Sequence, residues 1–192
     1  AFLQIAEEHG LLWEIDRWVV GKAISVIGER MRAGRQTTVL VKITQASLQD
    51  NTLQQYIQEK LARHGADGRQ LVLQLPESKV FTHLRAAQEF QAQVAPYGVR
   101  VGLEQFGVGL NSFQLLSHFN ADLLKIDRSF MEDLGSNPDH QARLREIAEK
   151  ARELGKTTIA EFVQDAASMS TLFGAGIDYA QGNFLAQCRR DY

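Results

Sequence analysis

The sequence predicts an α/β fold in which parallel strands alternate with helices, as in a modified (β/α)8, TIM-like barrel. Two observations lead to this prediction. Short β-branched or apolar runs alternate with longer segments of helical periodicity along the chain. Two of the apolar runs, residues 99–103 and 123–126, end abruptly in ionisable groups. Buried barrel strands end in this way where their C-terminal ends deliver side chains to a site.

The first half of the chain supplies two helices and two strands. A helix is expected over residues 14–33, stopped by Gly34, with an apolar face formed by Ile15, Trp18, Val19, Ala23, Val26 and Ile27. Strands are expected at 38–43 and 71–75. Ser47 and Asp50 have the spacing of a capping box. They predict a helix that runs through Leu53, Tyr56, Ile57 and Leu61 and ends near Gly65.

The second half continues the same alternation. A helix is expected at roughly 83–95, and further strands at 99–103, 123–126, 157–159 and 177–180. Asn137 before Pro138 is typical of a helix start, and the apolar face that follows is Leu144, Ile147, Ala148, Ala151 and Leu154. This gives about six strands, whereas a complete barrel has eight.

Composition limits the classes of protein to which the chain can belong. Its 192 residues with 44% apolar content predict one domain, 1–192, with one substantial core. The formal charge of -2 excludes a basic nucleic-acid groove. No stretch is apolar enough to predict membrane insertion or a signal peptide. The single cysteine, Cys188, cannot form an internal disulfide, which indicates a reducing, cytoplasmic compartment. Because the chain begins with Ala1 and not with Met, we expect it to be part of a longer protein.

Two motifs are the most informative part of the sequence. They are Leu-Glu-Gln-Phe-Gly-Val-Gly at 103–109 and Leu-Lys-Ile-Asp-Arg-Ser-Phe at 124–130. Together they resemble the EAL family, the bacterial phosphodiesterase domains that hydrolyse cyclic di-GMP. The family has two aspartates before Phe-Gly-x-Gly, followed by Lys-Ile-Asp-Arg-Ser-Phe. Residues 2–20 are similar to the family segment that follows the Glu-Ala-Leu strand. The resemblance therefore implies an EAL-type barrel whose first strand lies before Ala1.

The resemblance also implies that several metal ligands of the family are substituted here. The family's hydrolysis uses two divalent ions, which require hard oxygen ligands. Lys42 stands at a family asparagine, and Gln74, Gln105 and Gln164 stand at family acids. Amides are poor substitutes for carboxylates at Mg²⁺, and a lysine repels a dication. We therefore expect a degenerate phosphodiesterase with no catalytic residue, no bound metal and no required cofactor.

The ligand implied by the resemblance is cyclic di-GMP, and the expected contact residues are Asp16, Asp127, Glu161, Phe162, Gln181 and Gly182. Phe162 replaces a family glycine. It offers a stacking surface for guanine, a contact of about 1–3 kcal/mol per base on single-strand precedents, or alternatively packs into the core. Asp16 resembles a position that accepts hydrogen bonds from a guanine edge, or is otherwise an ordinary exposed helical aspartate.

Two lysines complete the expected site. Lys125 resembles the family lysine that helps to orient the attacking water. Lys42, with Lys125 beside it, is expected to neutralise the retained acids Glu104, Glu161 and Asp127 in place of metal. Alternatively, Lys42 extends into solvent and pairs with nothing.

Within the family, Gln-Phe-Gly at 105–107 and Ala-Glu-Phe-Val-Gln at 160–164 resemble the FimX-type receptors. This resemblance implies a cyclic di-GMP receptor that signals through a PilZ-domain protein in type IV pilus control and twitching motility. Dimer formation is left open. The alternative functions are a nucleotide-independent scaffold and a residually active cyclic di-GMP phosphodiesterase.

Overall fold

The computed structural model describes residues 4–5 and 10–182, so Cys188 lies outside the described residues. The chain forms two compact units, Ala1–Gly102 and Leu103–Tyr192. Each unit is described by itself below, and the expectation of a single domain stays a prediction. Among the described residues, no helix has both the length and the apolar character needed to cross a membrane.

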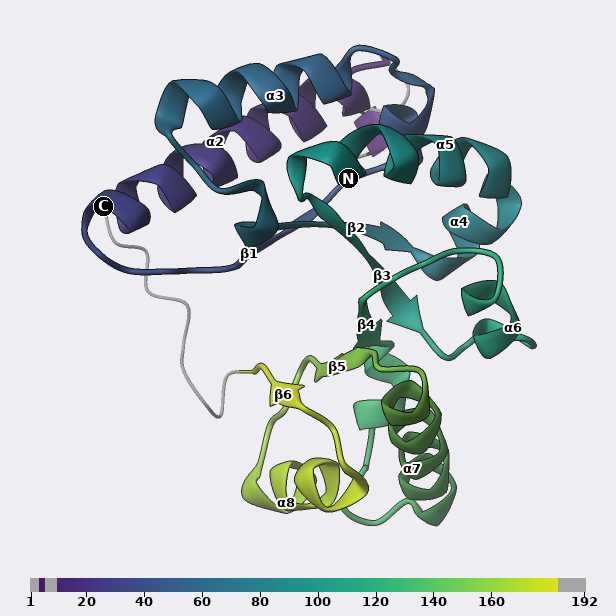
Figure 1. Ribbon diagram of the computed structural model, residues 1–192. Helices are drawn as coiled ribbons and strands as arrows, with labels where there is room; N and C mark the ends of the chain where they lie inside the picture. Colours follow the sequence, from purple (N-terminus) through teal and green to yellow (C-terminus); the bar gives the residue numbers. More distant parts are fainter. Residues whose placement is uncertain (1–3, 6–9, 183–192) are drawn as a thin grey trace. The chain divides into compact units, whose positions relative to one another are not determined.

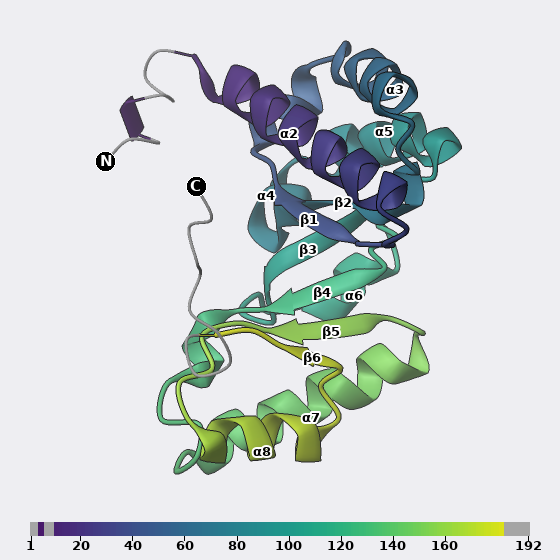
Figure 2. The ribbon, with the colours of Figure 1, turned by 90° about the vertical axis from the view of Figure 1, so that its left-hand side faces the viewer.

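The described strands follow one another in the sheet in sequence order (Figures 1 and 2). They are β1 (Val39–Lys42), β2 (Leu71–Pro76), β3 (Arg100–Phe106), β4 (Leu123–Ile126), β5 (Thr157–Ala160) and β6 (Tyr179–Ala180). The pairs β1–β2, β4–β5 and β5–β6 are parallel. At least one α-helix lies between each pair of consecutive described strands, which confirms the predicted α/β alternation.

The helices of the first unit that pack on its strands or on one another are α2 (Leu12–Arg32), α3 (Leu53–His64), α4 (Glu77–Thr82) and α5 (Leu84–Val94). Helix α2 packs on β1 and β2, α4 packs on β2, and α3 packs on α2. Helices α2 and α3 lie side by side in both ribbon views. Gly28 of α2 permits this, because a Cβ there would collide with the backbone carbonyl of His64 at the end of α3. The core of the unit includes the fully buried Ile24, Ile27, Leu71 and Leu73.

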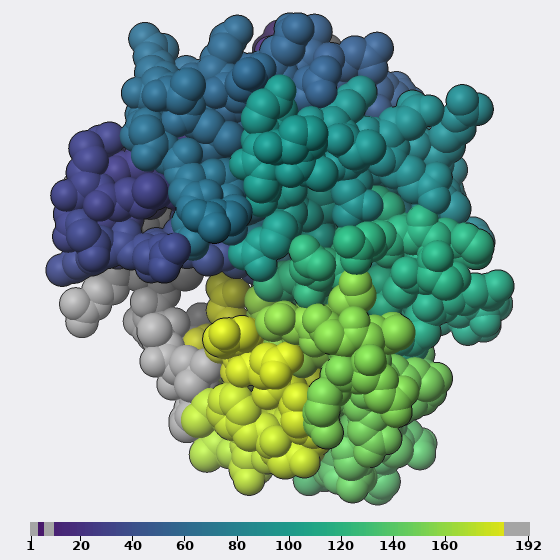
Figure 3. All heavy atoms as spheres, in the orientation of Figure 1, coloured from purple at the N-terminus to yellow at the C-terminus, as the bar shows by residue number. Residues whose placement is uncertain are grey.

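The second unit is built around β4, β5 and β6. Its helices are α6 (Ser112–Leu116), α7 (Pro138–Glu153) and α8 (Ala166–Ala175). In Figure 3 the atoms of α8 lie directly against those of α7. The predicted start of α7 is confirmed, since Asn137 Oδ1 accepts hydrogen bonds from the backbone N–H groups of Asp139 and His140, both at 3.1 Å.

Three details of the predicted helices are wrong. Trp18 is 68% exposed and the buried face of α2 instead includes Asp16, because the face that meets the sheet is rotated from the predicted one. Ser47 does not begin a helix; it lies in a 3₁₀ turn, Gln45–Gln49, and its hydroxyl donates to Asp16. Helix α3 begins at Leu53. Leu154 follows the end of α7 and is exposed.

Candidate functional site

The neighbouring strands β4 and β5 define the edge at which most of the expected site residues lie. Their parallel register pairs Ile126 with Ala160, the last residue of each strand. The residues that follow, 127–128 and 161–162, therefore leave the sheet side by side at the same C-terminal edge. In barrel-type α/β folds this edge is where ligand-binding side chains gather.

A largely buried ion pair crosses between these two strands. Lys125 Nζ lies 2.8 Å from Glu161 Oε1, and the side chains are only 7% and 19% exposed. Lys125 is paired in register with Ile159, two residues before Glu161, so both side chains project from the same face of the sheet. The long lysine side chain spans the step between them. The charge of Glu161 is thus compensated by Lys125.

The Asp127 side chain binds the backbone of the turn that follows it. Its Oδ1 accepts a hydrogen bond of 2.9 Å from the N–H of Ser129 and caps the 3₁₀ turn Arg128–Met131 that follows β4. The carboxylate is half-buried. This bond fixes the direction in which the chain leaves the strand, and it thereby sets the position of Arg128.

Phe162 is held in an unusual backbone conformation at the end of β5. Its φ is 63°, in the left-handed region that costs a residue with a Cβ roughly 1–2 kcal/mol. The side chain is 49% exposed, so the alternative that Phe162 packs into the core is wrong. The guanidinium carbon of Arg128 lies 5.7 Å from the centre of the ring.

A cavity of about 400 Å³ opens beside this aromatic ring. Its volume is within the ~300–1,000 Å³ typical of small-molecule sites. Both the ring and the guanidinium line it, as do residues from the turn after β4 and one residue after β5; the full set is Arg128, Met131, Glu132, Asp133, Phe162 and Gln164.

Gln181 and Gly182 extend the sheet beyond β6. The N–H of Gln181 donates to the carbonyl of Ala160 at 2.8 Å, and its own carbonyl accepts from Val163 at 3.1 Å. A Cβ at position 182 would collide with the backbone of Val163, so glycine is required for this close approach. Both residues therefore hold the segment that contains Phe162 in place.

In the first unit, Asp16 is a buried carboxylate with three donors. Its Oδ2 accepts from the backbone N–H and the hydroxyl of Thr44, both at 2.8 Å, and from the hydroxyl of Ser47 at 2.6 Å. Burial raises the pKa of Asp16, and the hydrogen bonds from Ser47 and Thr44 oppose part of that rise. At 3% exposure it is not the exposed helical aspartate of the alternative interpretation. Contact with a guanine edge stays a prediction.

The side chains at positions 42 and 74 differ in exposure, although β1 and β2 pair the two residues in register. Lys42 is exposed, and its expected role in neutralising the retained acids stays a prediction; in the second unit Lys125 pairs with Glu161. Gln74 is 1% exposed, and neither its Nε2 nor its Oε1 has a hydrogen-bond partner among the described residues. A buried amide in that state loses its hydration without compensation, which favours a polar ligand at this strand end.

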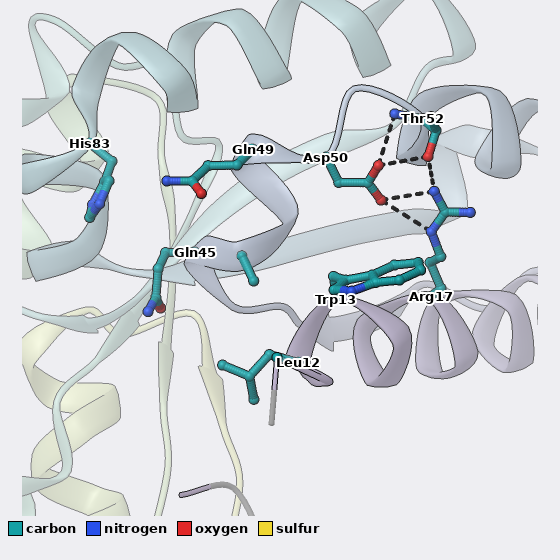
Figure 4. A pocket seen from close by; sticks show the side chains of 10 residues that line it. Leu12, Trp13, Arg17, Gln45, Gln49, Asp50, Thr52 and His83 are labelled. Atoms are coloured by element: carbon teal, nitrogen blue, oxygen red, sulfur yellow. Dashed lines mark hydrogen bonds and ion pairs between the residues drawn. The ribbon is translucent and has the colours of Figure 1, made fainter. Parts of the chain in front are cut away.

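A further cavity of the first unit was not predicted from the sequence. It measures about 740 Å³ and lies near the end of β1 and the start of α2. Figure 4 shows Gln45, Gln49 and His83 on one side, and Trp13 with Arg17 on the other. The indole of Trp13 lies 5.1 Å from the Arg17 guanidinium carbon, and Arg17 pairs with Asp50 at 2.9 Å. The signal in the sequence was an aromatic residue and a cation one helical turn apart.

Asp50 is held as a carboxylate by this network. Burial raises its pKa, but hydrogen bonds from Thr52 and Arg17 outweigh that effect and place the pKa below its ordinary value. The ion pair therefore keeps its charge and its geometry at neutral pH. Across the described residues, no three or more histidine, cysteine or acidic side chains gather in a way that could hold a metal ion.

A parallel α/β fold with polar side chains at the carboxyl ends of its strands defines a ligand-binding domain of the barrel type. Residues 1–188 match the EAL domain family. The chain belongs to that family, and the predicted fold class is confirmed.

Solved structures refine this relationship. The EAL domain of Xanthomonas citri FimX in complex with c-diGMP is 54% identical, with a TM-score of 0.93, over 97% of this chain and 74% of that chain. The FimX EAL domain from Pseudomonas aeruginosa bound to c-di-GMP is 33% identical, with a TM-score of 0.90, over 97% and 74%. The predicted resemblance to FimX-type domains is confirmed.

Two curated relatives show the wider family. The cyclic di-GMP phosphodiesterase PdeF of Escherichia coli is 27% identical over 187 residues, which cover 97% of this chain and 25% of that protein. The signaling protein YkoW of Bacillus subtilis is 27% identical over 186 residues, with 97% and 23% covered. The chain thus spans about a quarter of the length of these relatives.

Proposed function

We propose that this domain is a cyclic di-GMP receptor that binds the nucleotide without hydrolysing it. The observation that carries the proposal is Phe162, a half-exposed aromatic ring beside a cavity at the end of β5. Its positive φ makes the residue unfavourable on conformational grounds, so a contact outside the fold is the simplest reason for an aromatic residue there. A guanine stacked on the ring supplies that contact.

The other expected contacts fit a nucleotide in the same way. Glu161 presents a carboxylate fixed by Lys125, and Asp127, Gln181 and Gly182 shape the strand ends around it. In the first unit, the three bonds to Asp16 all end on Oδ2. Its Oδ1 is therefore the oxygen assigned to a guanine N–H donor.

The absence of hydrolysis follows from the chemistry of the substituted positions. Gln74, Gln105 and Gln164 offer neutral amides where two-metal hydrolysis needs carboxylates, and Lys42 adds a positive charge. The buried amide of Gln74 can donate to a ligand oxygen and accept from a ligand donor, which suits nucleotide binding better than metal binding. We therefore assign no catalytic residue and no cofactor.

The output is proposed to be protein contact. The 54% identity to a FimX EAL domain supports signalling through a PilZ-domain protein in the cytoplasm, with type IV pilus control and twitching motility as the process. The test of this part is a pull-down of PilZ-domain proteins with and without cyclic di-GMP. Equal recovery of all PilZ proteins, or of none, in both conditions would count against it.

Binding is tested by calorimetric titration with cyclic di-GMP, together with chromatography for the linear dinucleotide after incubation with Mg²⁺ or Mn²⁺. We expect saturable binding and no product above background. Phe162→Ala should weaken binding by about 1–3 kcal/mol through lost stacking.

Phe162→Gly is the sharper companion variant. It should weaken binding equally, yet leave the melting temperature unchanged or slightly higher, since glycine relieves the left-handed strain. A large drop in melting temperature would mean that the ring serves the fold and not a ligand.

A second candidate is favoured by one comparison. The relationship to PdeF, a cyclic di-GMP phosphodiesterase, supports residual hydrolysis by this chain. Metal-dependent formation of linear product that disappears in Glu161→Gln would replace the receptor proposal with this one.

A further inference from the structure

Arg128 is a feature of the second unit that the proposed function does not yet use. It is exposed and lines the same cavity as Phe162. Within the described part of the chain, its guanidinium makes no hydrogen bond or ion pair, and its Cζ lies 5.7 Å from the centre of the Phe162 ring. Its planar set of N–H donors is therefore available to a ligand.

The pairing of β4 with β5 sets the position of Arg128 relative to Phe162. Strands β4 and β5 are paired up to Ile126 and Ala160, and positions 128 and 162 each lie two residues further along. The Asp127 cap fixes the start of the turn that carries Arg128. A base that stacks on Phe162 would thus have a guanidinium within reach of its edge.

The chemistry of that edge distinguishes the bases. Guanine presents two acceptors, O6 and N7, on one edge, and an arginine fork donates to both at once; adenine has a donor in place of O6. Lysine carries the same charge but cannot form this planar, two-pronged contact. The cavity also contains Glu132, whose carboxylate is an acceptor type that suits the N–H groups on the opposite edge of guanine.

We propose that Arg128 is a specificity-determining residue that recognises the O6/N7 edge of the guanine stacked on Phe162. This inference rests on the proposed function. The guanidinium lies over the Phe162 ring. On binding it moves to the edge of the base while the base takes its place on the ring.

The test compares two ligands, cyclic di-GMP and its analogue with 7-deazaguanine bases, which lacks the N7 acceptor. Wild-type protein should bind the parent about 10-fold more tightly than the analogue, in the range of one bidentate contact. In Arg128→Met and Arg128→Lys this ratio should fall to about one. In Phe162→Ala both ligands should weaken equally, and the ratio should persist. Arg145→Ala, which removes an exposed arginine of α7, controls for the change in net charge and should alter neither affinity.

The outcomes separate the two proposals. If wild-type protein binds neither ligand, the proposed function is wrong and the role of Arg128 is overturned with it. If wild-type protein binds cyclic di-GMP but Arg128→Met weakens both ligands by the same factor, only the role of Arg128 is overturned. The arginine then contacts a phosphate or stacks on the base, neither of which depends on N7.

Discussion

At the scale of single residues, Asp16 is buried, and its Oδ2 accepts three hydrogen bonds. Loss of hydration disfavours its charged form and is the largest influence on its pKa, whereas the Ser47 and Thr44 donors favour that form. The net pKa is raised. The protonated form is therefore favoured by folding, and the carboxylate is retained at some expense of stability.

This pKa shift predicts a pH dependence of defined sign for Asp16→Asn. Because the folded pKa exceeds the unfolded value, wild-type stability relative to the variant should be greatest below pH 3.8 and should be lost as pH rises through the folded pKa. Each pKa unit between the folded and the unfolded value corresponds to about 1.4 kcal/mol of unfolding free energy. Urea denaturation at intervals from about pH 3 to pH 7 measures the difference in unfolding free energy between the two proteins.

Asp67→Asn provides the matched control of opposite sign. The pKa of Asp67 is lowered, chiefly by the side-chain hydrogen bond from Arg69. Its contribution should be present at neutral pH and lost as pH falls through its folded pKa. A parallel trend for both variants would contradict the assignment of burial as the dominant influence on Asp16.

The Lys125–Glu161 pair leads to a second prediction at this scale. Lys125→Met should destabilise the second unit by about 3 kcal/mol, because it leaves a largely buried carboxylate without its counter-charge. Adding Glu161→Gln should recover part of the loss, since an amide does not need that charge. Urea denaturation of the two single variants and the double variant gives the coupling energy. A loss below about 0.5 kcal/mol would place the pair among solvent-screened ones.

At the scale of elements, the sequence predicted the strands best. Each of the described strands lies within two or three residues of its expected position, since short buried apolar runs have few other ways to satisfy their backbone. The helices α4, α6 and α8 were missed. The first two are short, and α8 has an apolar composition with little periodicity.

The errors in the site have long-range causes. Ser47 has the local spacing of a helix cap, but its hydroxyl is recruited by Asp16, 31 residues earlier in the chain. The exposure of Phe162 and its contact with Arg128 depend on the register of β4 with β5, which no local pattern encodes. The residue types at the strand ends were predictable, whereas their partners were not.

The end of α3 gives a prediction at the same scale. Gly65 stops the helix with φ 59°, and a Cβ there would meet no atom within 4 Å. Gly65→Ala should therefore destabilise by about 1 kcal/mol through backbone strain alone. Gly174→Ala, inside α8 and also in open space, should stabilise by up to about 1 kcal/mol. Thermal unfolding of both variants checks the contrast. Equal shifts would mean that local space, and not φ, determines the effect.

At the scale of the whole molecule, we propose that side chains, and not metal ions, balance the charge at the strand ends. Lys125 already compensates Glu161, and amides stand at positions 74, 105 and 164. Neutral amides and an internal ion pair reduce the negative charge that could attract a dication, although Glu104 and Asp127 are retained. Affinity for the nucleotide should accordingly depend on protein groups alone.

We therefore expect cyclic di-GMP to bind with the same Kd in EDTA as in Mg²⁺, within about twofold. The ligand should also raise the melting temperature equally in both buffers, because a ligand that binds the folded state stabilises it according to its Kd. The matched control restores acids at the amide positions in one variant, Gln74→Glu, Gln105→Asp and Gln164→Glu. Carboxylates there supply hard ligands and repel the nucleotide phosphates. Its binding should become weaker in EDTA and recover on addition of Mn²⁺.

Calorimetry on both proteins in both buffers gives four affinities. A wild-type Kd that rises in EDTA as it does in the variant would show that metal still takes part, and the receptor would then be a metal-dependent one.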